Sequence, residues 1–225
     1  INFLLDAYNY FRDLPYTLDR GRRIEAMRDL GECYLYNKDY TEAHEWFGKL
    51  WTYGNRHNLK GPKIISALAL ANTYLYRNKP DSAEVFLDTA HHFINLYTDH
   101  NYDEAFARYV HGKVLTEKNT CQKAVATIRE AINQISPSNY VFQKYRYHKA
   151  LADAFACSGQ LDSALHYYQY ALQSPDSVLH IDIQYAISEV YQMAENYEQA
   201  LVHTEWGNAL YQKLFNSTKV KEVGY

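Results

Sequence analysis

A pattern that recurs about every forty residues constrains this chain more than any other feature of its sequence. In each copy a large apolar anchor residue is followed nine residues later by alanine, and a small residue stands three positions before the anchor. Five copies keep this spacing without a gap. The anchors are Tyr34, Tyr74, Leu115, Phe155 and Tyr191, and the alanines are Ala43, Ala83, Ala124, Ala164 and Ala200. Such a pattern predicts a stack of like units, because one unit cannot bury its own apolar face.

The composition favours helices. The chain has 9 glycines and 5 prolines among 225 residues, too few for a fold with many tight turns. Four of the prolines fall in short polar breaks between apolar segments, namely Pro62, Pro80, Pro137 and Pro175. The sequence shows no β-hairpin pattern. We therefore predict an all-α fold with two helices in each copy.

The first copy carries the clearest motif, with Leu30 and Gly31 before Tyr34, and Ala43 after it. This Leu-Gly-x-x-Tyr…Ala pattern resembles the tetratricopeptide repeat (TPR) family over about residues 2–215. The resemblance implies a TPR-like right-handed superhelix of about five antiparallel helix pairs. The period of about forty residues exceeds the usual 34, which we interpret as longer helices.

We expect a single TPR-like array over residues 1–225. Residues 1–23 are expected to be the second helix of a truncated repeat, so that the chain begins inside a longer protein. The expected repeats are 24–60, 61–100, 101–138, 139–176 and 177–216, and residues 217–225 are expected to begin a connector.

Charge excludes one class of partner for this region. The 23 Lys and Arg residues nearly balance the 26 Asp and Glu residues, giving a net charge of −3, so a basic nucleic-acid binder is not expected. No apolar run has the roughly 18 residues that a spanning helix needs. A membrane link is therefore expected only through a segment outside this chain.

Cysteines and histidines do not form a recognisable reactive site. Cys33, Cys121 and Cys157 are too few and too scattered for a disulfide framework or a zinc site, and we expect free thiols. His91 and His92 are adjacent, so on a helix they point in different directions. No phosphate-binding loop or hydrolase motif is present. We predict no catalytic residues, no metal and no cofactor.

The TPR resemblance implies a concave groove lined by the first helix of each pair. Counting from each anchor places ten candidate binding residues there: Arg28, Tyr36, Asn72, Tyr76, Tyr109, Lys113, Arg146, Lys149, Asp153 and Tyr185. The three cations Lys113, Arg146 and Lys149 among aromatic rings suit a peptide carboxylate or an acidic side chain. The alternative is that these charges only solvate an open groove. Leu68 replaces the lysine with which similar arrays clamp chaperone tails, so that clamp is not expected.

These features favour a non-catalytic module that binds a protein or peptide. One hypothesis is the sensory or scaffolding region of a larger bacterial regulator, because the long tyrosine-rich repeats look like the extracytoplasmic TPR regions of Bacteroidetes-type membrane regulators and sensor kinases. A periplasmic location would follow. The alternatives are a cytoplasmic, peptide-responsive TPR regulator that controls a DNA-binding output, and an accessory subunit of an enzyme. A homodimer is a further option, since neither end has a polar capping helix.

Overall fold

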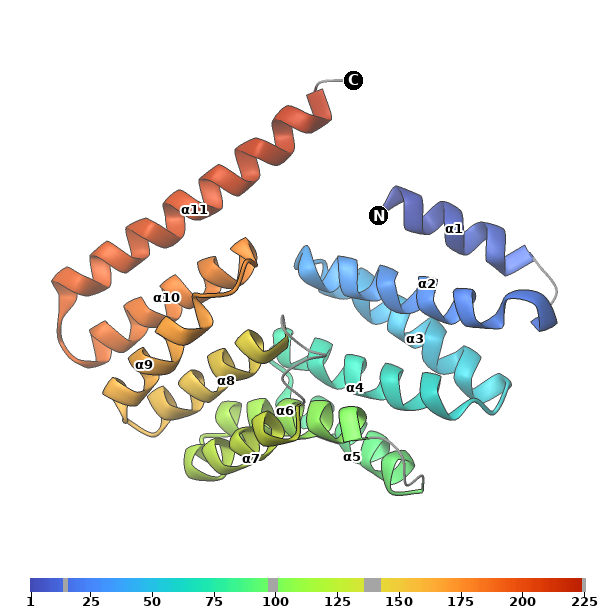
Figure 1. Ribbon diagram of the computed structural model, residues 1–225, viewed down its shortest axis with the longest axis horizontal. Helices are drawn as coiled ribbons and strands as arrows, with labels where there is room; N and C mark the ends of the chain where they lie inside the picture. The colour runs from blue at the N-terminus through green and yellow to red at the C-terminus, as the bar shows by residue number, and fades with distance from the viewer. Residues whose placement is uncertain (14–15, 97–100, 136–142, 224–225) are drawn as a thin grey trace. The chain divides into compact units, whose positions relative to one another are not determined.

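The computed structural model describes the backbone of residues 1–13, 16–96, 101–135 and 143–223. Helices account for all of the regular structure in these ranges, as the sequence predicts (Figure 1). The helices are α1 (Asn2–Asp13), α2 (Tyr16–Tyr36), α3 (Tyr40–Arg56), α4 (Lys60–Tyr76), α5 (Pro80–Asn95), α6 (Asn101–Glu117), α7 (Cys121–Gln134), α8 (Gln143–Cys157), α9 (Leu161–Ala171), α10 (Ser177–Met193) and α11 (Tyr197–Val223).

The same turn joins the two helices of all five pairs. Four residues after each anchor the backbone enters the left-handed region, with φ between 54° and 74°, at Lys38, Asn78, Asn119, Gly159 and Glu195. The next residue donates its N–H to the carbonyl oxygen of the anchor, as Asp39 does to Tyr34 at 2.9 Å. This geometry is that of a Schellman helix end. A turn of constant length explains why the five copies tolerate no gap.

Two helix ends differ from the expected repeat limits. Helix α2 begins at Tyr16, inside the segment 1–23 that we assigned to a truncated repeat, and α1 ends at Asp13. Helix α11 continues to Val223, through residues expected to begin a connector. The expected limit at 138–139 lies outside the described residues. The repeat limits themselves stay predictions.

Two prolines lie at helix starts rather than in the breaks where we placed them. Pro80 is the first residue of α5, and Pro62 lies in the first turn of α4. Proline is tolerated there because the first N–H groups of a helix have no partner within the helix.

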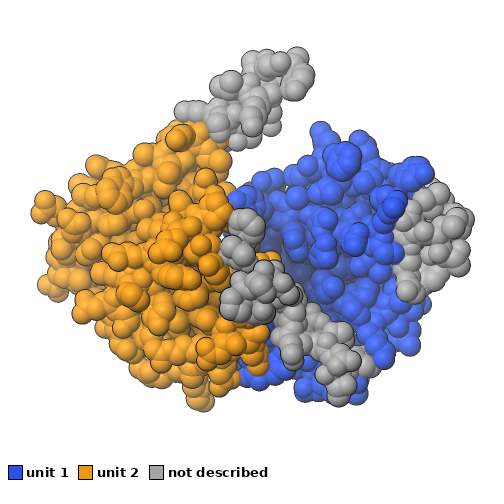
Figure 2. Space-filling view, viewed as in Figure 1, with its two compact units in different colours: residues 1–114 blue, residues 115–225 orange. Residues whose placement is uncertain are grey.

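The chain divides into two compact units, residues 1–114 and residues 115–225 (Figure 2). In the first unit, Leu30, Phe47 and Leu50 are almost completely buried. Gly31 explains how closely α2 and α3 approach, because a Cβ there would lie less than 3.0 Å from three ring atoms of Phe47. A small residue at this position therefore allows the two helices of the pair to pack closely.

In the second unit, the fifth repeat closes its helix pair with polar contacts. Ser188 of α10 donates its hydroxyl to the Ala200 carbonyl oxygen at 2.7 Å. The Ser188 and Thr204 hydroxyl oxygens lie 2.8 Å apart. The hydroxyl groups therefore satisfy each other and the backbone at a position where other repeats use apolar packing.

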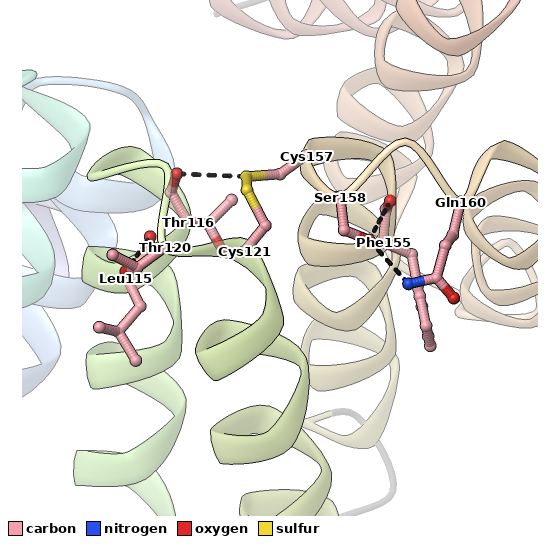
Figure 3. The surroundings of a disulfide bond; sticks show 8 residues. All are labelled: Leu115, Thr116, Thr120, Cys121, Phe155, Cys157, Ser158 and Gln160. Carbon is pink, nitrogen blue, oxygen red and sulfur yellow. Dashed lines mark hydrogen bonds between the residues drawn. A yellow bond between two sulfur atoms is a disulfide. The ribbon is translucent and has the colours of Figure 1, made fainter.

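The prediction of free thiols at Cys121 and Cys157 was wrong. The two residues form a disulfide, with their Cα atoms 5.5 Å apart (Figure 3). Cys121 is the first residue of α7 and Cys157 is the last residue of α8. Cys33, which is partly exposed, is a free thiol.

For five of the partly buried histidines, burial lowers the pKa below the ordinary value of 6.5. They are His44, His91, His111, His148 and His203. The His91 and His111 rings meet edge to face between α5 and α6, with centroids 6.2 Å apart. A positive charge on His111 would lower the pKa of His91 further, after the larger effect of burial.

We predict that two glycines of the first helix pair respond oppositely to alanine. Gly31→Ala should reduce the free energy of unfolding by about 1–3 kcal/mol, because the new methyl group overpacks against Phe47. Gly48→Ala is the matched control and should raise it by about 0.5–1 kcal/mol, because a Cβ there meets no atom within 4 Å. Urea unfolding followed by fluorescence of Trp46 and Trp51 measures both. Equal effects would contradict the packing of α2 on α3.

We also predict that acid destabilises the first unit partly through His91 and His111. Because the pKa of each is lowered on folding, the unfolded chain binds more protons as the pH falls. Their contribution is present above about pH 6.5 and is lost as the pH falls below it. The drop in thermal midpoint between about pH 7.5 and about pH 5.5 should shrink in the double variant His91→Gln, His111→Gln. An unchanged drop would contradict this role.

Candidate binding surface

Four of the ten candidate residues come together in the first unit. Lys113 of α6 donates from Nζ to the Asn72 side-chain oxygen of α4 at 2.8 Å. The same ammonium lies 4.3 Å from the Tyr76 ring centroid and 5.5 Å from that of Tyr109. These distances are those of cation–π contacts. The positions predicted for the groove therefore bring the Lys113 ammonium close to the rings of Tyr76 and Tyr109.

The aromatic part of this cluster extends onto neighbouring helices. Tyr76 stacks on Tyr40, the first residue of α3, with ring centroids 5.5 Å apart and planes 9° apart. Tyr109 stacks on Phe106 one turn earlier in α6, at 5.8 Å. Tyr40 was absent from the candidate residues, which were taken from the first helices alone. The signal that could have found it is its place six residues after an anchor, at the start of a second helix.

Exposure separates the rings that can touch a partner from those that support them. Tyr76 is 42 % exposed, and Tyr36, which holds the same position two residues after its anchor, is 44 % exposed. Tyr109 is 7 % and Asn72 8 % exposed. Tyr36, Tyr76 and Lys113 thus offer accessible surface, whereas Asn72 and Tyr109 hold the lysine in place.

The candidate cations of the second unit pair with carboxylates. Arg146 of α8 donates to Asp176 at 3.0 Å. Asp176 is also the N-cap of α10, where its other oxygen accepts from the Val178 and Leu179 N–H groups. The arginine therefore ties α8 to the start of α10 through a carboxylate that already stabilises the helix end.

Lys149 takes part in a second polar network. Its ammonium donates to Asp153 one turn later in α8 at 2.9 Å, and the other Asp153 oxygen accepts from the Tyr168 hydroxyl at 2.7 Å. Burial, with a smaller effect of the Asp153 charge, raises the pKa of Tyr168 above its ordinary value. The phenol therefore stays protonated and acts as a donor between α8 and α9.

The remaining two candidates make local contacts. Arg28 pairs with Asp29 at 2.8 Å and with Glu32 at 3.9 Å, all on α2. Tyr185 packs its ring near Gly207 of α11 and donates its hydroxyl to Asn208 at 2.9 Å. Tyr185 thus joins the two helices of the fifth pair.

Among the residues that the structure describes, no group of three or more His, Cys, Asp or Glu side chains is arranged to hold a metal ion. Within those residues no helix combines the length and the apolar character needed to cross a bilayer.

No family model matches this sequence, and no curated protein matches it. Solved structures do match. BtubC (BKLC) from P. vanneervenii is 13 % identical and superposes with a TM-score of 0.62, over 95 % of this chain and 90 % of that one. A putative kinesin light chain of Podosopora anserina with nearly identical TPR-like repeats is 14 % identical, with a TM-score of 0.54, over 86 % and 97 % of the two chains. The chain therefore has the all-helical fold of TPR-like repeat proteins.

Proposed function

We propose that this chain is a protein- or peptide-binding module. The observation that carries the proposal is the cluster in the first unit, where Lys113 lies between the Tyr76 and Tyr109 rings and is held by Asn72. Its members come from α4 and α6, the first helices of their pairs. The TPR-like fold supports the role of an interaction module.

The chemistry of the cluster suits a partner that presents a carboxylate. The Lys113 ammonium carries a full positive charge, and its N–H groups are hydrogen-bond donors, one of them to Asn72. Charge-assisted hydrogen bonds to carboxylates are about twice as strong as neutral ones. The exposed Tyr76 and Tyr36 rings add contact area with few rotatable bonds, so ordering them costs little entropy. An acidic side chain or a C-terminal carboxylate of a peptide fits this combination.

We place recognition at Lys113 rather than at Arg146 and Lys149. Arg146 bridges to the helix cap Asp176, and Lys149 shares Asp153 with Tyr168. Replacing either cation by a residue of opposite charge would disturb a structural carboxylate as well as any ligand. Arg146 is therefore better explained as a link between helices and Lys149 as part of the Asp153–Tyr168 network, and Lys113 gives the cleaner test.

We predict that Lys113→Met lowers the preference for acidic peptides about tenfold or more. Methionine keeps a similar apolar stem against Tyr76 and Tyr109 but removes the charge. Lys49→Met is the matched control, because Lys49 also lies over an aromatic ring, 3.8 Å from the Trp46 centroid, but on the second helix α3. The probe is an array of acidic peptides with Asn- and Gln-substituted counterparts, applied to the full chain. Equal preference in the Lys113→Met and Lys49→Met proteins would contradict the proposal.

We further propose that the module is the extracytoplasmic sensory or scaffolding region of a larger bacterial regulator. The Cys121–Cys157 disulfide supports this compartment over the cytoplasm, because thiols of cytoplasmic proteins are kept reduced. A cytoplasmic peptide-responsive regulator and an enzyme accessory subunit remain the alternatives without such support.

The compartment has a direct test in intact cells. A membrane-permeable alkylating reagent is added to the cells before lysis and is kept present while the protein is denatured. It should modify the free thiol of Cys33 and leave the disulfide-bonded Cys121 and Cys157 unmodified. Mass spectrometry of the peptides measures each cysteine. Alkylation of all three cysteines would contradict the extracytoplasmic proposal and favour the cytoplasmic alternative.

A further inference from the structure

Two contacts in different units occupy the same place in the repeat. The Tyr40–Tyr76 stack joins the first residue of α3 to the last residue of α4, and the Cys121–Cys157 disulfide joins the first residue of α7 to the last residue of α8. In both cases the first partner stands six residues after its anchor and the second stands two residues after the next anchor. The sequence separation is 36 in both pairs. This position is a joint between successive repeats.

Within the second unit, the same positions in the fourth and fifth repeats hold different residues, Leu161 and Met193. The joint is therefore a position where side-chain chemistry varies from repeat to repeat. A disulfide at this position links the ends of two helix pairs by a covalent bond. Stacked rings link them through dispersion and ring electrostatics instead. The covalent joint alone responds to redox conditions.

We propose that the Cys121–Cys157 disulfide is a reversible clamp between the third and fourth repeats, opened by thiol–disulfide exchange with a dithiol reductant. This goes beyond the binding role proposed above and does not depend on it. Both cysteines are partly exposed, so a reductant can reach them. Figure 3 shows the bond at the turn end of the helices, beside the turn that holds Thr120.

The surroundings of the two sulfur atoms differ, and this assigns the direction of exchange. Cys121 is the first residue of α7, where the helix dipole and the N-terminal N–H groups stabilise a departing thiolate. Cys157 Sγ lies 3.7 Å from the Thr116 carbonyl oxygen, which can accept from a thiol but not from a disulfide (Figure 3). Cys121 is thus the better leaving group, whereas the Thr116 carbonyl oxygen stabilises reduced Cys157 as a protonated thiol.

The exchange has two steps. A thiolate of the reductant attacks Cys157 Sγ, forms a mixed disulfide with it and expels Cys121 as a thiolate. The second thiol of the reductant then attacks the sulfur atom that the reductant contributed to the mixed disulfide, and this releases Cys157. Cys157 takes up a proton and donates to the Thr116 carbonyl oxygen. Two electrons pass from the dithiol, which ends as a disulfide, to the protein, which ends with two reduced cysteines.

We expect reduction by dithiothreitol to loosen this joint without unfolding the chain. Hydrogen exchange at the turn amides of Thr120 and Gln160 should accelerate about tenfold or more. Asp39 is the internal control, because its N–H makes the same turn hydrogen bond in the first pair, whose joint is the Tyr40–Tyr76 stack. Unchanged exchange at Thr120 and Gln160 after complete reduction would overturn the proposal, as would three free thiols in the oxidised protein.

Cysteine variants distinguish the loss of the disulfide from a general effect of dithiothreitol on hydrogen exchange. The double variant Cys121→Ser, Cys157→Ser should exchange rapidly with or without dithiothreitol, and Cys33→Ser should behave as the parent. Cys121→Tyr with Cys157→Tyr copies the Tyr40–Tyr76 stack and should slow exchange to a rate that dithiothreitol does not alter. In reduced Cys33→Ser protein, iodoacetamide should modify Cys121 before Cys157. Faster modification of Cys157 would overturn the assigned direction of exchange.

Discussion

The rest of the structure depends on one recurring hydrogen bond, from the N–H five residues after each anchor to the carbonyl oxygen of that anchor. The bond requires a residue in the left-handed region just before it, and that residue is glycine only at Gly159. Asn78 and Asn119 tolerate this conformation, whereas Lys38 and Glu195 adopt it at some cost. Every pair nevertheless has this turn, because it sets the register in which α2 packs on α3 and in which the two helices of each later pair pack on each other.

This register also decides where side chains can meet between repeats. With the turn constant, the residue two positions after an anchor always stands at the end of a first helix. Tyr76 therefore reaches Tyr40 of the preceding pair, and Cys157 reaches Cys121. The same arrangement contributes to the candidate binding cluster, because Tyr76 stacks on Tyr40 between two repeats and also contacts the Lys113 ammonium. A change at this joint in the first unit would thus alter the binding surface as well.

Much of the fold followed from spacing alone. The ungapped distance from anchor to alanine predicted the helix pairs, and the structure shows that only a small residue at Gly31 fits against Phe47. The clustering of Asn72, Tyr76, Tyr109 and Lys113 also followed, because helical register places them on facing first helices. The disulfide did not follow. Two cysteines 36 residues apart carry no local pattern, and only the repeat register brings them together.

The amino-acid sequence by itself determined the class of fold and the helix pairs, because these depend on local spacing that repeats five times. Tertiary structure alone decided which partner lies beside each of the candidate cations and which rings are accessible. Arg146 and Lys149 appeared equivalent to Lys113 in sequence, yet Asp176 and Asp153 lie close enough to pair with them. The physical reason is that a counter-ion acts through distance in space, and the carboxylate that pairs with Arg146 lies thirty residues away in the chain.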